Sequence, residues 1–334
     1  MFSHRKCLSL LVLQGLVCTA YAQDQSCLHR TLPISIHDSH GLLVRGFVPS
    51  DFVADFNRIA VNVLSIRSDD RPHRIVILLD VGENMKGAKT GKQWTTAIAI
   101  AYNLARSRLP NTSLALILFS DEVREQINFS QGNSAVEKRL LDIKNDSDYA
   151  KKGVRGASAL LDAIVSALQF LGDSHSSDEI YLITQGFDFR SKASPIDVRN
   201  ALASSGVRLN LAPLVPETEV RGLRVEARSY PSVDDLAVDS GGLVLAAPGV
   251  TVPGSFARQA SVSYDLTQEQ LKLLSFGLAQ LYIGMTRNDL LEVELPQTVD
   301  KTSAWSLQFS PASRKIHKDL IITYPNELAP CSAL

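Results

Sequence analysis

The chain has 334 residues, of which 45% are hydrophobic and 21% are charged, and its formal net charge is −1. This composition is typical of a globular protein and excludes a disordered or fibrous chain, and the length allows about two domains. The near-neutral balance provides no basic excess for nucleic acid or an acidic membrane, so we expect neither as a partner.

The first 22 residues have the pattern of a secretory signal peptide. A basic head at Arg5 and Lys6 precedes an apolar run over residues 8–17, and residues 20–22 (Ala-Tyr-Ala) form a small-x-small cleavage pattern. We therefore expect cleavage after residue 22 and a secreted protein, periplasmic or extracellular, with no integral membrane segment remaining. An uncleaved membrane anchor is the alternative, although the apolar run is short for a membrane span.

Residues 23–70 are predicted to form an N-terminal β segment. Apolar and polar positions alternate, as around Ile34 and Ile36, and the whole segment favours three or four strands. His37 and His40 are isolated histidines near a turn, and we expect both to be solvated.

Strand and helix patterns alternate across residues 71–250. Continuous aliphatic runs at 75–79 and 180–183 suit strands that are buried on both faces of a parallel sheet. Apolar residues at helical spacing follow at 93–107 and 158–171. Further strands are expected at 114–119, 123–129, 207–215 and 243–245. We therefore predict an α/β domain with a doubly wound, mostly parallel six-stranded sheet and helices on both faces.

The segment 251–334 begins with a helix pattern that ends at Leu278 and continues with four β-patterned stretches. These stretches are residues 281–285, 290–295, 305–309 and 320–323. The simplest partners for them are the strands of residues 23–70. We therefore predict one smaller β-rich subdomain built from both ends of the chain, with the α/β domain inserted between them.

Two of the four cysteines, Cys7 and Cys18, lie in the signal peptide pattern, which leaves Cys27 and Cys331. Export permits disulfide bonds, so we predict that Cys27 and Cys331 pair and tie the two ends of the chain together. Two free thiols are the alternative. In the loop-entropy model a loop of this length contributes up to ~5 kcal/mol to the free energy of unfolding.

Short motifs at both ends and in the centre of the chain carry a family resemblance. They are DSHG at 38–41, VRG at 44–46, DF at 51–52, DVGEN at 80–84, YIG at 282–284 and YPNELAP at 324–330. These motifs are similar to those of the von Willebrand factor A (VWA) domain family, and the whole layout resembles the secreted bacterial VWA-related proteins. The resemblance covers nearly the whole chain after the signal peptide. It implies protein–protein interaction through the loops at the carboxyl ends of the sheet strands.

The metal site of that family uses D-x-S-x-S after the first strand, a threonine at a helix start, and an aspartate after the fourth strand. The resemblance maps these positions onto Asp80, Gly82, Asn84, Ser158 and Gln185, so a serine oxygen and a carboxylate are missing. Mg²⁺ prefers octahedral oxygen ligands that include one or two carboxylates. We therefore predict a degenerate metal site at Asp80, Asn84, Ser158 and Gln185, and no bound metal or other cofactor.

The sequence shows no catalytic set, so we predict a secreted, non-catalytic binding module that docks an unknown protein partner through the loops at the carboxyl edge of the sheet. The first alternative is an adhesion module that depends on a weakly bound divalent cation such as Mg²⁺. The second is a hydrolase with Ser158 as nucleophile, because residues 156–160 resemble a nucleophile elbow, although the final glycine is missing.

Overall fold

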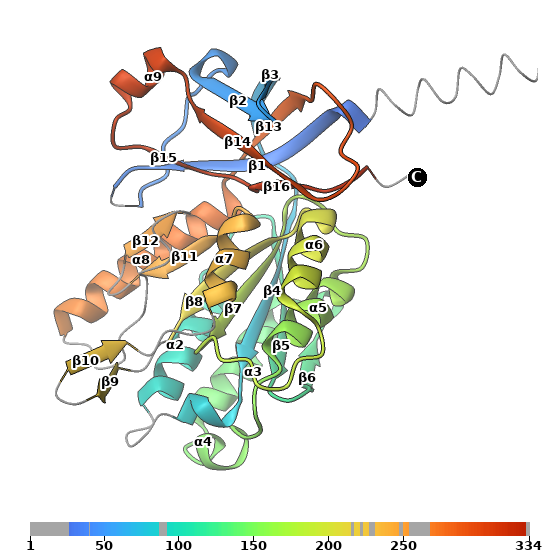
Figure 1. The fold of residues 1–334 in the computed structure, drawn as a ribbon. Coiled ribbons are helices and arrows are strands. Elements are labelled where there is room, and N and C mark those ends of the chain that lie inside the picture. Colours follow the sequence, from blue (N-terminus) through green and yellow to red (C-terminus); the bar gives the residue numbers. More distant parts are fainter. Residues whose placement is uncertain are drawn as a thin grey trace, which may run out of the picture.

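The computed structural model describes residues 27–39, 41–86, 92–214, 217–220, 223–226, 231–246, 250–253 and 268–331. The predicted signal peptide and His40 lie outside the described residues. Within them, no helix has the length and apolar character needed to cross a membrane. Figure 1 shows two layers, an antiparallel sheet at the top and a helix-covered sheet below it.

The lower layer contains a seven-stranded sheet in the order β12-β11-β8-β7-β4-β5-β6. Its strands are β4 (His73–Asp80), β5 (Thr112–Phe119), β6 (Val123–Ile127), β7 (Asp178–Thr184), β8 (Arg208–Pro213), β11 (Leu243–Ala246) and β12 (Val250–Pro253). The five inner strands pair in parallel, whereas β6 and β12 are antiparallel edge strands. All six predicted strands are present, and β12 is an additional seventh. The predicted doubly wound α/β fold is confirmed.

Helices cover both faces of this central sheet, as Figure 1 shows. They are α2 (Lys92–Arg106), α3 (Asn133–Asn145), α4 (Tyr149–Lys152), α5 (Leu160–Leu171), α6 (Pro195–Ser205), α7 (Pro231–Asp239) and α8 (Gln268–Thr286). The core on one face packs against α2, α3 and α8, and the core on the other against α5, α6 and α7. Alternate residues of β4 enter the two cores: Ile75 and Ile77 the first, Val76 and Leu78 the second. This two-sided burial explains the continuous aliphatic run.

The strand predicted at residues 281–285 was wrong, because these residues form the last turns of α8. Leu278, Leu281, Tyr282 and Met285 are all buried, at the i, i+3, i+4, i+7 spacing of one helix face. They belong to the core that the central sheet shares with α2. The apolar stripe of a helix was therefore mistaken for a short strand.

The upper layer is an antiparallel sheet of seven strands in the order β15-β1-β13-β3-β2-β14-β16. The first part of the chain supplies β1 (His29–His37), β2 (Phe52–Phe56) and β3 (Ile59–Ser68), and the last part supplies β13 (Asp289–Glu294), β14 (Ser303–Phe309), β15 (Ile321–Thr323) and β16 (Glu327–Leu328). Because β13 pairs with both β1 and β3, the sheet needs both ends of the chain. The predicted β-rich subdomain with an inserted α/β domain is confirmed. The boundaries placed after residues 22, 70 and 250 stay predictions.

Short elements lie between the strands and helices of each layer. They are the 3₁₀ turns η1 (Pro49–Asp51), η2 (Glu83–Lys86) and η3 (Phe129–Gln131), the helix α9 (Pro311–Ile316), and the hairpin strands β9 (Glu217–Val220) and β10 (Leu223–Glu226). Of these, η2 directly follows the turn after β4.

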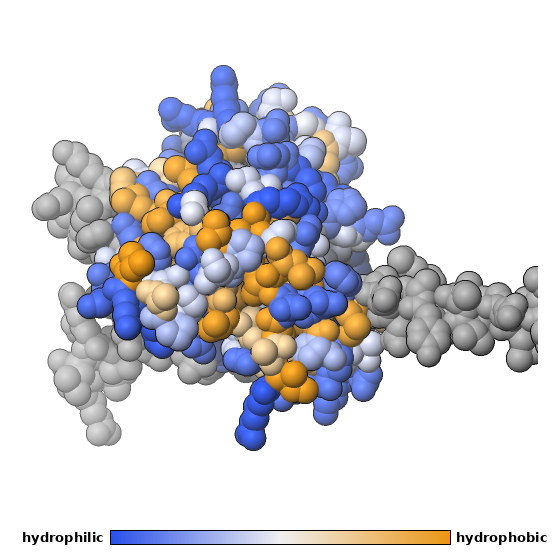
Figure 2. Space-filling model, turned by 90° about the horizontal axis from the view of Figure 1, so that it is seen from above, coloured by the Kyte–Doolittle hydropathy of each residue, from blue (hydrophilic) through white to orange (hydrophobic). Residues whose placement is uncertain are grey.

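The upper sheet has apolar residues on both of its faces. Its core includes Phe47, Phe52 and Phe309, whose ring centroids lie 5.6–6.0 Å apart. On the outside, Val53 of β2 and Ile59 of β3 are 44% and 47% exposed. Figure 2, which views the molecule from above, shows apolar residues gathered among hydrophilic ones on this face.

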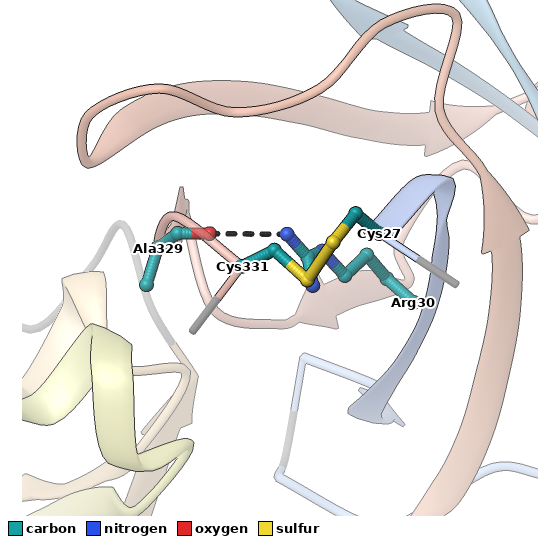
Figure 3. The surroundings of a disulfide bond; sticks show 4 residues. All are labelled: Cys27, Arg30, Ala329 and Cys331. Carbon is teal, nitrogen blue, oxygen red and sulfur yellow. Dashed lines mark hydrogen bonds between the residues drawn. A yellow bond between two sulfur atoms is a disulfide. The ribbon is translucent and has the colours of Figure 1, made fainter. Parts of the chain in front are cut away.

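Cys27 and Cys331 form a disulfide bond with a Cα–Cα distance of 5.5 Å, so the predicted pairing is confirmed (Figure 3). Beside it, the guanidinium of Arg30 donates a hydrogen bond of 3.3 Å to the carbonyl oxygen of Ala329. The start of β1 and the segment after β16 are thus held side by side.

His37 is fully buried, so its predicted solvation was wrong. It is the last residue of β1, and its ring nitrogens lie 3.2 Å from the carbonyl oxygen of Gly41 and 3.0 Å from Oγ of Ser35. A Cβ atom placed on Gly284 of α8 would lie 3.1 Å from the imidazole ring. His37 therefore packs where the upper sheet meets α8, which sequence alone did not show.

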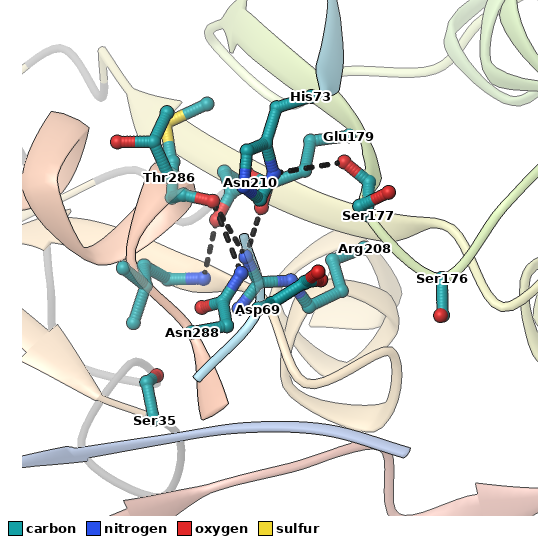
Figure 4. A network of polar contacts seen from close by, with 12 residues as sticks. Ser35, Asp69, His73, Ser176, Ser177, Glu179, Arg208, Asn210, Thr286 and Asn288 are labelled. Atoms are coloured by element: carbon teal, nitrogen blue, oxygen red, sulfur yellow. Dashed lines mark hydrogen bonds and ion pairs between the residues drawn. The ribbon is translucent and has the colours of Figure 1, made fainter. Parts of the chain in front are cut away.

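A buried polar network joins the central sheet to the connection between α8 and β13 (Figure 4). Glu179 of β7 accepts hydrogen bonds from Arg208 and, at 2.7 Å, from Asn210, both on β8. Arg208 also donates to the carbonyl oxygen of Met285 at 3.0 Å, and so does Asn288 at 3.1 Å. Burial raises the pKa of Glu179 to about 7, and the nearby guanidinium opposes that rise.

Candidate functional site

The candidate site lies at the carboxyl ends of β4 and β7, neighbouring parallel strands in the middle of the central sheet. Asp80 is the last residue of β4, and Thr184 is the last residue of β7. Ser158 comes from the segment just before α5, and Gly82 from the turn just before η2. The chain switches direction across the sheet between these strands, which is the usual place for ligands in doubly wound folds.

Asp80 is 1% exposed and both of its carboxylate oxygens accept hydrogen bonds. Oδ1 accepts from the hydroxyl of Ser158 and from the backbone N–H of Gly82, both at 2.8 Å. Oδ2 accepts from the hydroxyl of Thr184 at 2.7 Å. Burial raises the pKa of Asp80 to about 6, and these hydrogen bonds oppose the rise. A cation that bound Asp80 would compete with these donors.

Gly82 leaves room for the Ser158 hydroxyl. A Cβ atom at position 82 would lie 2.2 Å from Oγ of Ser158 and 2.9 Å from Oδ1 of Asp80. Any side chain at this position would therefore have to displace the hydroxyl that Asp80 binds. Gly82 thus has two effects. It lacks the serine oxygen of the family's ligand pattern, and it lets the Ser158 hydroxyl approach Asp80.

Gln185 and Asn84 form a second contact beside Asp80. The side-chain N–H of Gln185 donates a 2.6 Å hydrogen bond to the backbone carbonyl oxygen of Asn84. Gln185 is 3% exposed, and this partly buried bond ties the end of β7 to η2. Because an amide N–H is a donor, a carboxylate at this position could not make the same contact.

The four predicted site residues thus meet in two pairs, Asp80 with Ser158 and Gln185 with Asn84. Sequence reasoning missed Thr184, whose hydroxyl binds Asp80 and also accepts a 2.9 Å hydrogen bond from the N–H of Gly186. The available signal was its position at the end of a buried strand, one residue before Gln185.

Residues 75–187, which run from β4 to just past β7, match the family model of the von Willebrand factor type A domain. The chain contains a von Willebrand factor type A domain. The matched residues include every predicted site position, from Asp80 to Gln185. The VWA family is one of interaction modules.

Several solved structures are similar to the chain. BatB from Bacteroides thetaiotaomicron is 14% identical, with 63% of this chain and 98% of that chain covered and a TM-score of 0.41. A von Willebrand factor type A protein from Catenulispora acidiphila is 11% identical, with 91% and 74% covered and a TM-score of 0.41. Proximal thread matrix protein 1 from the mussel byssus is 10% identical, with 69% and 50% covered and a TM-score of 0.45. A comparison with curated protein sequences found no match.

The loop after β7 of the VWA domain is held by carboxylates that accept backbone hydrogen bonds. Asp188 accepts from the N–H of Ser191 at 3.1 Å, and Asp162 of α5 accepts from the N–H groups of Lys192 and Ala193 at 2.8–3.1 Å. The N–H of Phe189 donates to the carbonyl oxygen of Ser158 at 2.9 Å. The loop is therefore fastened directly to the segment that carries Ser158.

This loop presents an aromatic side chain to solvent. Phe189 is 57% exposed, and its ring stacks on that of Phe187 with centroids 5.7 Å apart. Beside it lies a hollow of about 430 Å³, formed by η2, the segment before α5 and the loop after β7. The lining residues are Glu83, Asn84, Gly156, Ala157, Phe189 and Arg190. The exposed edge of the VWA sheet thus combines a hollow with an aromatic residue above the enclosed Asp80.

Proposed function

We propose that the chain is a secreted, non-catalytic interaction module that docks a partner protein on the loops at the carboxyl edge of its VWA sheet, without a metal at Asp80. One observation carries the proposal: the loop after β7 holds Phe189 in solvent beside a hollow, while Asp80 beneath it is enclosed by donors from its own chain. Aromatic side chains, phenylalanine included, are enriched in the cores of protein–protein interfaces.

The interaction can be tested with a photo-reactive amino acid in place of Phe189, and with the same group in place of Ile59 as a control on the other layer. Both side chains are about half exposed, at 57% and 47%. We expect a discrete cross-linked product from position 189 in the native secreted mixture and none from position 59. The product should persist when a chelator is present. Equal products from both positions would contradict docking at this edge.

Metal-free docking is supported by the contacts of Asp80, whose two oxygens accept from Ser158, Gly82 and Thr184. A ligand that binds only the native state raises the free energy of unfolding by about 2.7 kcal/mol at a hundredfold excess over its dissociation constant. We expect Mg²⁺, Mn²⁺ and Ca²⁺ at millimolar concentration to leave the Tm unchanged. A rise in Tm that Asp80→Asn abolishes would instead support the cation-dependent adhesion module.

A non-catalytic role is supported by the position of Ser158. Its side chain is fully buried and its hydroxyl donates to Asp80, whereas a serine nucleophile is activated by a neighbouring base and must reach its substrate. We expect a broad serine-directed probe to leave the chain unlabelled. Labelling that disappears in Ser158→Ala would establish the hydrolase alternative.

Export is supported by the signal peptide pattern of residues 1–22 and by the Cys27–Cys331 disulfide, a bond that persists in oxidising compartments. Amino-terminal sequencing of the protein released by a secreting host is expected to begin at residue 23. A chain that keeps its first residues and stays with the membrane fraction would support the membrane-anchor alternative.

A further inference from the structure

The upper sheet has a gap between β1 and the segment 324–330. β1 pairs with β15 as far as Ser35 and Thr323. The disulfide then joins Cys27 to Cys331, which the register of the β1–β15 ladder would also place opposite each other. The two chain segments are therefore held in one register at both ends of the gap, yet between these ends the segment leaves β1 and pairs with β14 through β16.

The edge of β1 along this gap carries backbone groups that its ladders do not use. The N–H of Leu295 donates to the carbonyl oxygen of Leu28 at 2.9 Å, so Leu28 and every second residue after it bond toward β13. The residues between them, which include Thr31 and Pro33, face the opposite edge. β15 covers that edge only from Ser35 onward. The N–H and C=O groups of Thr31 therefore face the gap.

Two prolines explain why the β1–β15 ladder stops where it does. In its register the next hydrogen-bonded pair after Ser35 and Thr323 would be Pro33 with Pro325. Proline has no backbone N–H, so neither member of this pair can donate a hydrogen bond to the other. The chain after Pro325 is thus released from β1, and the gap follows from the sequence itself.

The facing side of the gap presents matching groups. The N–H of Trp305 donates to the carbonyl oxygen of Asn326 at 3.1 Å, so Asn326 bonds toward β14. Glu327 is the next residue and pairs with Ala304 of β14. Because bonding directions alternate along an antiparallel strand, the N–H and C=O groups of Glu327 face away from β14 and into the gap. In the continued register, Glu327 lies opposite Thr31.

The gap opens into a cavity of about 260 Å³ between the two layers. Residues 30–33 of β1 form one wall, residues 327–330 the facing wall, and residues 202–206 at the end of α6 a third. The guanidinium of Arg30 reaches across one end and donates to the carbonyl oxygen of Ala329 (Figure 3). In a paired ladder this oxygen would accept from a backbone N–H, so the walls stand further apart than two paired strands.

The charges around the cavity balance. Asp239 and Glu327 are the two carboxylates among the lining residues, and Arg30 is the one cation among them. The Nε atom of Arg199 lies 2.9 Å from a carboxylate oxygen of Asp239 and 3.9 Å from one of Glu327. Two guanidinium groups and two carboxylates sum to zero, so the cavity favours an uncharged occupant.

We propose that the gap binds an extended, uncharged peptide segment of a partner protein as one added strand between β1 and β16. The backbone of this segment would bond to Thr31 on one side and to Glu327 on the other. Main-chain hydrogen bonds of this kind give affinity wherever a strand is added to a free sheet edge. Rows of backbone donors and acceptors on both sides match a polypeptide, whereas the chain's own segment is kept out by Pro33 and Pro325.

The site is separate from the docking edge of the proposed function. It is lined by Ser176 and Val207, which lie before β7 and β8, whereas Asp80 lies at the carboxyl ends of the strands. The inference therefore stands or falls independently of a cross-link from position 189.

The experiment uses the full mature chain and a peptide of alternating threonine and valine, which is uncharged in its side chains and favours β structure. Hydrogen exchange is measured at single amides by NMR. We expect millimolar peptide to slow exchange at Thr31 and Glu327 about tenfold, because both amides become hydrogen-bonded. The amide of Leu32, which already bonds toward β13, is the internal control and should not change. A peptide with N-methyl groups on its central residues keeps the side chains but should not protect.

A substitution at one position separates the backbone from the side chain. Thr31→Pro removes the N–H that faces the gap and no ladder bond, and Pro33 shows that proline fits this edge of β1. We expect about tenfold weaker binding of the fluorescent threonine–valine peptide, measured by anisotropy. The matched control Thr31→Val keeps the N–H and should bind as the unchanged chain does. Urea denaturation shows whether each variant is folded.

Four results would overturn the inference. They are unchanged exchange at Thr31 and Glu327, equal protection by the N-methylated peptide, equal binding by Thr31→Pro, and a dimer of the free chain that Thr31→Pro dissociates. The last result, measured by light scattering, would assign the gap to a second copy of the chain.

Discussion

At the scale of single residues, the polar groups around the loop after β4 hydrogen-bond to one another. The family pattern predicted a degenerate metal site at Asp80, Asn84, Ser158 and Gln185, which stays a prediction, and it did not show which hydrogen bonds these side chains make. The hydroxyls of Ser158 and Thr184 turn to Asp80, and the amide N–H of Gln185 turns to the backbone of Asn84. Side-chain direction depends on the packed loops, which a sequence pattern does not contain.

Restoring the family serine should harm this arrangement. In Gly82→Ser the new Cβ would lie 2.2 Å from Oγ of Ser158, so we expect a loss of about 1–3 kcal/mol in the free energy of unfolding, measured by urea denaturation. The same substitution in a Ser158→Ala background should cost less, because the crowded oxygen is gone. Equal costs in the two backgrounds would mean that Ser158 is not the obstacle.

His37 makes stability depend on pH. Burial lowers its pKa from 6.5 to about 4, with Arg208 adding to the decrease and Asp38 opposing it. Between these values the unfolded chain binds a proton that the folded chain does not. The free energy of unfolding therefore decreases by about 3 kcal/mol as the pH falls from 6.5 toward 4.

The control for this prediction is His37→Asn, which keeps hydrogen-bonding groups but does not titrate. Urea denaturation between pH 7 and pH 4 should show a smaller loss for this variant than for the unchanged chain. Parallel pH profiles would show that His37 does not contribute.

At the scale of secondary-structure elements, a strand or helix was predictable where its local pattern of apolar residues is strong. The central strands were predictable because both faces of each are apolar, whereas α3 was missed because only Val136, Leu140 and Ile143 of its residues are buried. The end of α8 was mistaken for a strand, because Leu281 and Tyr282 are adjacent apolar residues that also suit β structure. Pairing between strands far apart in sequence was predictable only in outline, because the β patterns at the two ends of the chain name possible partners but not their order or register.

The link between β7 and β8 depends on a buried ion pair. Glu179 and Arg208 are both fully buried, so Glu179→Gln leaves a guanidinium without its counter-charge and should cost about 3–5 kcal/mol of unfolding free energy. The double change Glu179→Leu with Arg208→Met should cost less, because neither charge then remains buried. Chemical denaturation measures both.

A surface pair supplies the control for this prediction. Arg139 and Glu125 are each 33% exposed, and Glu125→Gln should cost about 1 kcal/mol or less. A Glu179→Gln variant no less stable than Glu125→Gln would show that the buried pair is unimportant.

At the scale of the whole molecule, the chain begins and ends in one sheet and builds a second layer in between. The sequence allowed this arrangement to be predicted because the β patterns lie at the two ends and the alternating α/β pattern lies in the middle. It did not show that α8 would pack on the central sheet, nor that Glu179, Arg208 and Asn288 would meet beneath the upper layer. These contacts depend on how the layers pack.

The disulfide should stabilise both layers. Replacing Cys27 and Cys331 by serine is expected to lower the free energy of unfolding by about 2–4 kcal/mol, because the open chain gains conformational freedom when unfolded. Denaturation with and without a reductant measures the effect. The reductant should destabilise the unchanged chain and leave the double-serine variant unaffected.

The disulfide between Cys27 and Cys331 closes a covalent ring, and this ring has a mechanical consequence. Tension applied to the chain from outside residues 27–331 would pass through one covalent bond, and the chain across a sequence separation of 304 would carry none of it. An open chain of equal stability would transmit the same pull through its sheets and unravel. Anchored at its ends, this molecule would keep a fixed length, and the proposed docking edge would keep its shape under load.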